Sequence, residues 1–228
     1  MIRTIMHYKV KGISIKSENA AKPIQQSSRY LIDWISAHGH VDSSLDYGCG
    51  KLRYTGSLYA ISSSLAITDS KIQLERTQLI DGAETSVLEY VQDQLPGCII
   101  YDLESFWNGI QEEFDFILCA NVLSAVPSAK VRAKSLRAVR SALKDNGQLL
   151  VVNQHTNSYF TQIKNDSRSI QHLDGWITQS RNGGAYYGLL NKEAIVTLLA
   201  RFGFKIIDAW VEGQSNYVLA GGNNDEIY

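Results

Sequence analysis

The feature that most constrains the fold of this chain is a regular alternation of short apolar runs with helical patterns. Five apolar runs have the length and composition of buried strands: Ser44–Tyr47, Ser64–Thr68, Cys98–Tyr101, Phe114–Ala120 and Gln148–Val152. Segments with helical spacing of apolar residues lie between most of them. Strands that alternate with helices form a parallel sheet covered on both faces. We therefore expect an α/β fold.

The last part of the chain departs from this alternation. A helix is expected between Asn191, its N-cap, and Gly203, which ends it. Its apolar face recurs at helical spacing, at Ile195, Leu198, Leu199 and Phe202. Two apolar runs follow, 204–211 and 217–220, with no helix between them. Because they are close in sequence, we expect them to pair antiparallel.

Four further helices are expected along the chain. One begins near Gln25 and ends at Gly39, and a second covers residues 53–63. A third is predicted as a single helix over residues 72–90. The fourth runs over residues 130–144 and is predicted to end at Asn146-Gly147, a typical C-terminal cap.

Charge and cysteine content exclude several classes of protein. The formal net charge is −1, from 22 basic and 23 acidic residues, so no overall field attracts the chain to nucleic acid or an anionic membrane. The three cysteines, Cys49, Cys98 and Cys119, form neither a disulfide framework nor a zinc-ligand pattern. Residues 1–16 have no long apolar stretch, as a signal peptide or membrane span would need. We expect a cytoplasmic location and no metal site.

Acidic and small residues follow the predicted strands where they end. The first strand delivers Asp46, Gly48 and Gly50, and the second delivers Asp69, 19 residues after Gly50. Ligands bind outside the carboxyl ends of strands in such sheets. Glycine lets a ligand approach backbone N–H groups, and an acid one unit later can accept hydrogen bonds from both hydroxyls of a ribose. These positions predict a nucleoside-binding site.

Six segments together resemble the class I S-adenosylmethionine-dependent methyltransferases. They are Leu45–Gly50, Asp69, Asp102–Leu103, Phe114–Leu123, Asn146–Val151 and Gly188–Phe204. The first is similar to the family's acidic residue followed by G-x-G, and the resemblance covers roughly residues 29–220. It implies a three-layer Rossmann-like fold with a mostly parallel seven-stranded sheet and one antiparallel strand near the C-terminus. It also implies S-adenosyl-L-methionine as the cofactor.

The resemblance implies roles for the residues of the first loop. Gly48, Cys49 and Gly50 would line the methionine portion of the cofactor, and Asp46 would stabilise the loop and the amino group. Cys49 is expected to contribute its backbone rather than a reactive thiol. One residue departs from the family pattern, because many members have a further small residue where this chain has Leu52.

The later matched positions would bind the rest of the cofactor. By the resemblance, Asp69, with Ser70 beside it, would hold the ribose. Asp102-Leu103 would contact the adenine, and the backbone at Ala120-Asn121 would lie near the amino acid end. A dinucleotide-binding site is the rival interpretation. A dinucleotide-binding loop would have a third glycine at the position of Arg53 and would need no acid at Asp46, so this interpretation is disfavoured.

The predicted domain has two additional segments. Residues 1–28 are expected to form an N-terminal arm, partly ordered or with a short edge strand, and residues 29–228 the methyltransferase domain. Residues 153–190 form an insertion that we expect to act as a lid over the acceptor pocket. Its aromatic residues Tyr159, Trp176, Tyr186 and Tyr187 are candidates for the substrate wall. His155 follows the fifth strand directly and is the candidate general base.

The methyl acceptor itself stays open at this point. A small molecule is favoured, because the charge is near neutral and the insertion is aromatic. RNA, DNA or protein is the alternative acceptor. The observation that supports it is a predicted helix with six basic residues, Lys130, Arg132, Lys134, Arg137, Arg140 and Lys144. A solvated face is the favoured interpretation of that helix. A further alternative is a non-catalytic module that binds S-adenosylmethionine. No oligomeric state follows from the sequence.

Overall fold

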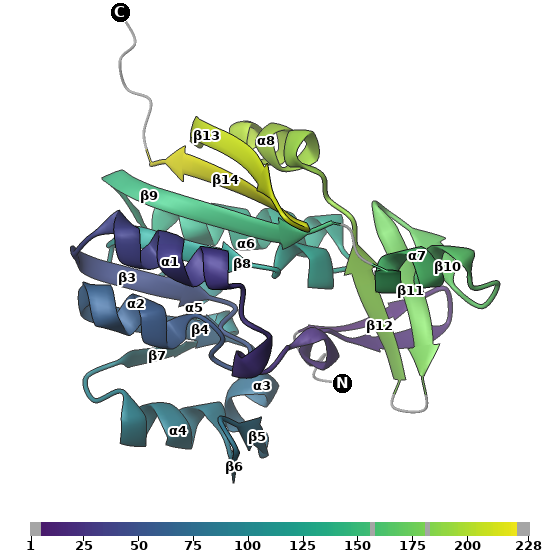
Figure 1. Ribbon diagram of the computed structural model, residues 1–228, viewed down its shortest axis with the longest axis horizontal. Helices are drawn as coiled ribbons and strands as arrows, with labels where there is room; N and C mark the ends of the chain where they lie inside the picture. Colours follow the sequence, from purple (N-terminus) through teal and green to yellow (C-terminus); the bar gives the residue numbers. More distant parts are fainter. Residues whose placement is uncertain (1–5, 156–157, 181–182, 223–228) are drawn as a thin grey trace, which may run out of the picture.

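The structure is a computed structural model that describes residues 6–155, 158–180 and 183–222 (Figure 1). Its main body is a seven-stranded sheet in the order β13-β14-β9-β8-β3-β4-β7. The strands are β3 (Val41–Tyr47), β4 (Ser62–Asp69), β7 (Ile99–Asp102), β8 (Phe114–Ala120), β9 (Leu143–Gln154), β13 (Lys205–Glu212) and β14 (Ser215–Gly221). Among these strands β14 runs opposite to the other six, pairing antiparallel with β13 and β9, and the remaining pairs are parallel. The predicted fold class is confirmed.

Two apolar cores cover the two faces of this sheet. One core contains residues of α5 (Leu103–Trp107), α6 (Ala129–Ser141) and α8 (Lys192–Arg201). The other contains residues of α1 (Arg29–His38), α2 (Thr55–Ile61), α3 (Lys71–Glu75) and α4 (Val87–Gln94). On β9, Leu149 and Val151 face the first core and Leu150 and Val152 face the second. This alternation explains why the central strands are continuously apolar.

A second sheet joins two segments that the sequence analysis treated separately. It has the order β1-β2-β12-β11-β10. Its strands are β1 (His7–Val10), β2 (Ile13–Lys16), β10 (Ile170–His172), β11 (Gly175–Ser180) and β12 (Gly183–Gly188). Ile15, Ile177 and Tyr186 form its small core. The sheet stands beside the carboxyl ends of the main strands, together with α7 (Ser158–Asn165) (Figure 1).

The single helix predicted over residues 72–90 is wrong. The structure has α3, the hairpin β5 (Gln78–Ile80) and β6 (Ala83–Thr85), and then α4. Asp81 and Gly82 form the turn, with φ of 46° and 85°. Asp-Gly is the pair that a tight hairpin turn prefers, since both of its residues need positive φ. Ser86 then begins α4 with a capping box that includes Glu89.

The predicted end of the basic helix is also wrong. Helix α6 ends at Ser141, and Asn146-Gly147 lies within β9. Leu143 continues the apolar spacing of the helix, but it is buried in β9 opposite Phe114. Lys144 pairs with Asp115 of β8 at 2.9 Å. A Cβ at Gly147 would lie 2.7 Å from the Phe114 carbonyl oxygen, so the glycine permits close strand approach rather than a helix cap.

The C-terminal end of α1 and both ends of α8 agree with the sequence, whereas α1 begins at Arg29 rather than near Gln25, where the structure has a separate short 3₁₀ turn. Gly39 ends α1 with φ of 92°, and Gly203 follows α8 with φ of 78°. Asn191 accepts a hydrogen bond from the Ala194 backbone N–H at 2.9 Å, as an N-cap does. The described part of the chain contains no helix with the length and apolar character that crossing a membrane requires.

Candidate functional site

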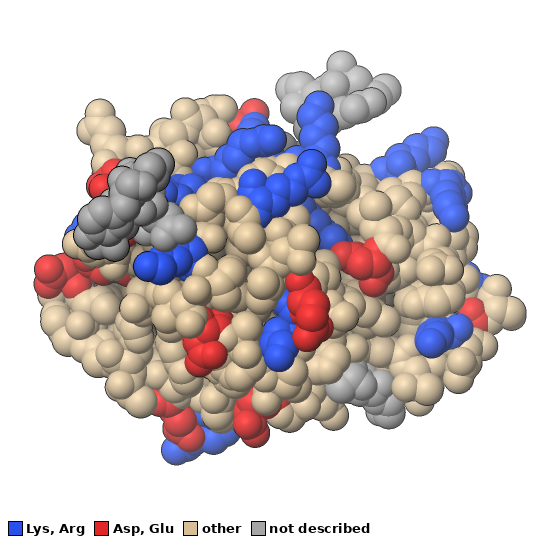
Figure 2. Space-filling model, turned by 90° about the horizontal axis from the view of Figure 1, so that it is seen from above, with Lys and Arg blue, Asp and Glu red and all other residues tan. Residues whose placement is uncertain are grey.

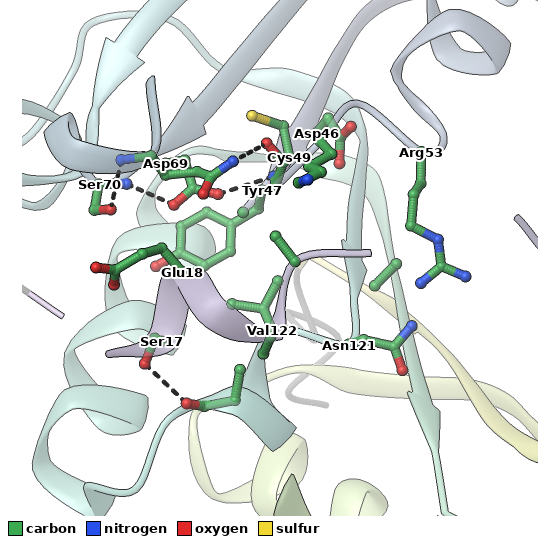
Figure 3. Close-up of a pocket in the computed structure, with 18 of the residues that line it drawn as sticks. Ser17, Glu18, Asp46, Tyr47, Cys49, Arg53, Asp69, Ser70, Asn121 and Val122 are labelled. Atoms are coloured by element: carbon green, nitrogen blue, oxygen red, sulfur yellow. Dashed lines mark hydrogen bonds between the residues drawn. The ribbon is translucent and has the colours of Figure 1, made fainter. Parts of the chain in front are cut away.

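A cavity with about 850 Å³ of open space lies at the carboxyl ends of β3, β4 and β8 (Figure 3). We call it the cofactor cavity. Most of the residues expected to bind the cofactor line it: Asp46, Gly48, Cys49, Gly50, Asp69, Ser70, Leu103, Ala120 and Asn121. The parallel register places Asp46 opposite Ile67, so Asp46 and Asp69 lie at the same edge of the sheet.

The loop after β3 adopts a conformation that needs glycine. Gly48 has φ of 74°, and its backbone N–H donates to the Thr68 carbonyl at 2.8 Å. A Cβ there would come within 2.5 Å of a methyl group of Val122. Gly50 has φ of 57°. A side chain is therefore excluded at Gly48 and strained at Gly50, and the loop backbone lines the cavity.

Asp69 is held by the same loop. Its carboxylate accepts hydrogen bonds from the Gly50 backbone N–H at 2.9 Å and from the Ser70 backbone N–H at 2.7 Å. Burial raises the pKa of Asp69 to about 6, although these two hydrogen bonds favour the charged form. Each carboxylate oxygen can accept more than one hydrogen bond. The carboxylate can therefore still accept donors from a ligand.

Asp46 is buried behind the loop. It is 4% exposed and accepts a hydrogen bond from the Thr55 hydroxyl at 2.6 Å. Burial raises the pKa of Asp46 to about 7, the Thr55 hydrogen bond opposes this shift, and the Asp69 charge adds to it. A positively charged group bound beside Asp46 would stabilise its ionised form.

Leu52, the departure from the family pattern, has φ of 63° and is only 3% exposed. Its backbone N–H donates to the Cys49 carbonyl at 2.9 Å, which closes the turn. The position thus has the left-handed conformation that favours glycine. The burial of the leucine side chain in the core around α1 and α2 compensates for that strain.

Asn121 also has a left-handed conformation, with φ of 62°. Its backbone N–H donates to the Val152 carbonyl at 2.7 Å, and its side-chain oxygen accepts from the Gln154 backbone N–H at 2.9 Å. The residue thus joins the ends of β8 and β9 beside the cavity.

Asp102 and Leu103 have different structural roles. The Asp102 carboxylate caps α5, accepting from the backbone N–H groups of Glu104 and Ser105 at 3.0 Å each. Leu103 is buried and lines the cofactor cavity, whereas Asp102 does not.

The N-terminal segment 17–22 forms a wall of the cavity that the sequence analysis missed. The Ser17 hydroxyl donates to the Ala125 carbonyl at 2.9 Å (Figure 3). Ala21 lies near Gly50. Glu18 lines the cavity, and its carboxylate lies 2.6 Å from His7 Nε2. The segment has no periodic apolar pattern, so only its contacts with distant residues reveal its place.

A second cavity adjoins the first. It has about 560 Å³ of open space, and we call it the aromatic cavity. Three of its residues are predicted substrate residues, and it is lined by Ala20, Lys22, Arg53, Asn121, Ser124, Ala125, Gln154, Tyr159, Phe160, Tyr186, Tyr187 and Gly188. Trp176 and His155 line neither cavity. Trp176 lies on β11 opposite Tyr187, and His155 follows β9 with its backbone N–H bonded to the Gln214 carbonyl.

A buried ion pair attaches the second sheet to α6. Arg132 of α6 is 6% exposed and binds Asp174 with both terminal nitrogens, one at 2.9 Å. The Tyr186 hydroxyl also donates to Asp174. Burial opposes the charge of Asp174, but Arg132 and Tyr186 outweigh it and lower its pKa. The pair holds the sheet over the aromatic cavity.

Other basic residues of the predicted basic helix also contact the protein. Lys134 lies 4.7 Å above the Trp107 ring, and Arg137 lies 5.4 Å above the Phe202 ring. Lys144 belongs to β9 and pairs with Asp115. On the face in Figure 2, basic side chains gather in the upper part and acidic ones lie mostly in the lower part. Lys130, Lys134 and Arg137 are exposed, so α6 has a solvated basic face, as the sequence favours.

Comparison with known proteins identifies relatives of this chain. No family model matches it. The uncharacterised protein YmfD of Escherichia coli (strain K12) is 37% identical over 219 residues, which cover 96% of this chain and 97% of YmfD.

Solved structures with a similar fold include methyltransferases. An S-adenosylmethionine-dependent methyltransferase from Clostridium acetobutylicum is 16% identical, with 90% of this chain and 94% of that chain covered and a TM-score of 0.62. The N-methyltransferase NodS from Bradyrhizobium japonicum, in complex with S-adenosyl-L-homocysteine, is 15% identical, with 89% and 91% covered and a TM-score of 0.57. The chain therefore belongs to the same family as YmfD and has the fold of the class I S-adenosylmethionine-dependent methyltransferases.

Proposed function

We propose that this protein is an S-adenosylmethionine-dependent methyltransferase that acts on a small molecule. The observation that carries the proposal is the convergence of Asp46, Gly48, Gly50 and Asp69 on one cavity. NodS, which has the same fold, is an N-methyltransferase solved with S-adenosyl-L-homocysteine. A cytoplasmic location is part of the proposal and is supported by three free cysteines.

The residues of the cofactor cavity fit the chemical groups of S-adenosylmethionine. Asp69 would accept hydrogen bonds from the ribose hydroxyls, with Ser70 beside it. Asp46 would favour the cationic amino group, and the open backbone around Gly48, Cys49 and Gly50 would hold the methionine portion. Leu103 offers an apolar surface for the adenine, whereas Asp102 would act by positioning α5. Ala120 and Asn121 would lie near the amino acid end.

The protein's contribution to methyl transfer would be mainly one of placement. The cofactor supplies an electrophilic methyl group on a sulfonium. Residues 17–22 cover one side of the cavity, and the second sheet covers the neighbouring aromatic cavity. Both would exclude water and orient the acceptor in line with the methyl group. His155 remains our proposed general base for an acceptor that starts protonated. Trp176 remains a proposed part of the substrate wall, although neither residue lines a cavity.

A small acceptor is favoured over nucleic acid or protein. The aromatic cavity is partly enclosed and adjoins the cofactor cavity, with Arg53 and Asn121 in both walls. The basic residues of α6 contact aromatic rings and Asp174 of the protein itself. The insertion 153–190 would then act as the lid of a pocket rather than as a surface for a polymer.

Calorimetry with S-adenosylmethionine and S-adenosyl-L-homocysteine, with NAD⁺ as the control ligand, tests the cofactor. Binding of the first two with one site per chain, and none of NAD⁺, is expected. Failure of both to bind would refute the function.

A labelled-methyl screen of small molecules from cell extract then tests the activity. Cofactor binding without any transfer would favour a non-catalytic binding module. Binding to oligonucleotides that weakens steeply with salt would favour a nucleic-acid acceptor.

A further inference from the structure

Two cationic side chains stand where the two cavities meet. Lys22 and Arg53 line both the cofactor cavity and the aromatic cavity, together with Asn121. Figure 3 shows Arg53 and Asn121 on one side of the pocket, away from Asp69 and Ser70. A group bound by these cations would therefore face the cofactor cavity while the rest of its molecule lies in the aromatic cavity.

Arg53 is held ready for an anion. Its guanidinium lies 5.1 Å from the centre of the Tyr54 ring. One terminal nitrogen donates to the Tyr54 hydroxyl at 3.1 Å and to the Gln26 carbonyl. Its Nε is buried and has no hydrogen-bond partner among the described residues. A planar guanidinium with unused donors matches the geometry of a carboxylate.

The walls of the aromatic cavity suit a flat ring. Tyr159 and Tyr187 pack edge to face with centroids 5.4 Å apart, and Phe160 lies 6.0 Å from Tyr187. The Tyr186 ring also lines the cavity, but its hydroxyl is bound to Asp174. Aromatic side chains in this arrangement present both faces and edges to an aromatic ligand.

The described lining of the aromatic cavity contains no acid and no histidine. Burial raises the pKa of the Tyr187 hydroxyl far above neutrality, so this group is a poor base. An acceptor that must lose a proton would therefore find no ready base in this cavity, and the acids nearest to it, such as Glu18, line the cofactor cavity. A carboxylate needs none, because it is already ionised at neutral pH.

These observations deepen the proposed function and rest on it. We propose that the methyl acceptor is an aromatic carboxylic acid, bound through its carboxylate to Arg53 and Lys22, and that the product is its methyl ester. A carboxylate oxygen donates an electron pair to form the O–CH₃ bond. The carbon–sulfur bond of the sulfonium breaks, and its electron pair stays on sulfur. No proton is transferred, so the step is complete with these two reactants.

Binding of matched probes tests the anion site. The full chain, saturated with S-adenosyl-L-homocysteine, is titrated with benzoate, phenylacetate and indole-3-acetate and with the corresponding uncharged amides. At least one acid is expected to bind at least tenfold more tightly than its amide. Arg53→Gln should remove most of this preference and Lys22→Gln at least threefold of it. The control Arg29→Gln removes an 86% exposed cation of α1 and should leave the preference intact.

The outcomes separate this proposal from the function on which it rests. The aromatic-acid proposal is overturned if acid and amide bind with equal affinity. It is also overturned if the protein binds S-adenosyl-L-homocysteine but none of the probes. Lack of S-adenosyl-L-homocysteine binding overturns the proposed function as well. If Arg53→Gln does not fold, the exposed Lys22→Gln decides the result. With labelled S-adenosylmethionine, mild base should release the label from the product as methanol, and a base-stable label contradicts ester formation.

Discussion

Two carboxyl groups at the rim of the sheet differ from surface acids, since Asp46 is buried and Asp69 is half-buried. The pKa of Asp46 is raised to about 7 and that of Asp69 to about 6, in both cases mainly by burial. Both groups could be selected from the sequence, since each follows an apolar strand at the expected spacing. Their surroundings could not be, because the Thr55 and Ser70 contacts depend on the local turns. The two shifts make separate predictions.

Asp46 is predicted to reduce the stability of the fold as pH rises. The unfolded chain loses this proton near pH 4, whereas the native state keeps it until about pH 7. Asp46→Asn keeps an oxygen for the Thr55 hydroxyl and carries no charge. We expect it to raise the free energy of unfolding by about 2–4 kcal/mol at pH 8, with the gain disappearing towards pH 4. Urea unfolding at several pH values measures this. A gain that does not vary with pH would contradict the account.

Asp69 is predicted to make cofactor affinity depend on pH. Its carboxylate accepts ribose hydroxyl donors best when it is ionised, and its pKa is about 6. Affinity for S-adenosyl-L-homocysteine should therefore fall by about tenfold between pH 7 and pH 5. Asp69→Asn should bind more weakly and lose most of this dependence. Fluorescence or calorimetric titrations in matched buffers measure it. The same dependence of affinity on pH in both proteins would contradict the assignment of Asp69 to the ribose.

The main elements of the fold differ in how well local sequence determines them. The β3 and β8 strands and helix α8 follow apolar patterns and caps that a short window contains. The region 72–90 is apolar at helical spacing, but the Asp81-Gly82 turn divides it into two helices and a hairpin. Turn chemistry at one pair of residues thus outweighs the periodicity of the surrounding segment.

The second sheet is a clear case of structure that depends on distant residues. Its strands β2 and β12 are separated by more than 150 residues and pair through Ile15 and Gly184. A Cβ at Gly184 would lie 2.7 Å from Ile13, so the contact requires glycine. No local pattern in residues 1–28 indicates this pairing. The residues 17–22 that line the cofactor cavity follow directly from β2 and were missed for the same reason.

The attachment of the second sheet is predicted to depend on Asp174. Asp174→Asn would leave the buried Arg132 guanidinium without its counter-charge, which should lower the stability of the protein by about 2–4 kcal/mol. Asp166→Asn removes the charged partner of Arg168, an 85% exposed cation in the same insertion, and is the matched control. Thermal unfolding should show a lower midpoint for the first variant and no change for the second. Equal midpoints for Asp174→Asn and wild type would contradict this role.

At the scale of the whole molecule, one edge of the main sheet carries the candidate chemistry. The seven-stranded order places the ends of β3, β4 and β8 side by side, and the second sheet stands beside them (Figure 1). The alternation of strands and helices predicted this edge, and together with the family resemblance it predicted nine of the 23 residues that line the cofactor cavity. It was not sufficient for Lys22 and Arg53, because their position between two cavities arises only when the N-terminal segment packs against the β3 loop.

The most direct test of the account is calorimetric binding of S-adenosylmethionine to the wild-type chain and to Asp69→Ala. Asp33→Ala, which removes an exposed acid of α1, is the control. Circular dichroism establishes that each variant is folded. The account predicts that Asp69→Ala binds at least tenfold more weakly and that Asp33→Ala binds as the wild type does. Unchanged affinity in a folded Asp69→Ala protein would contradict the assignment of this cavity to the cofactor.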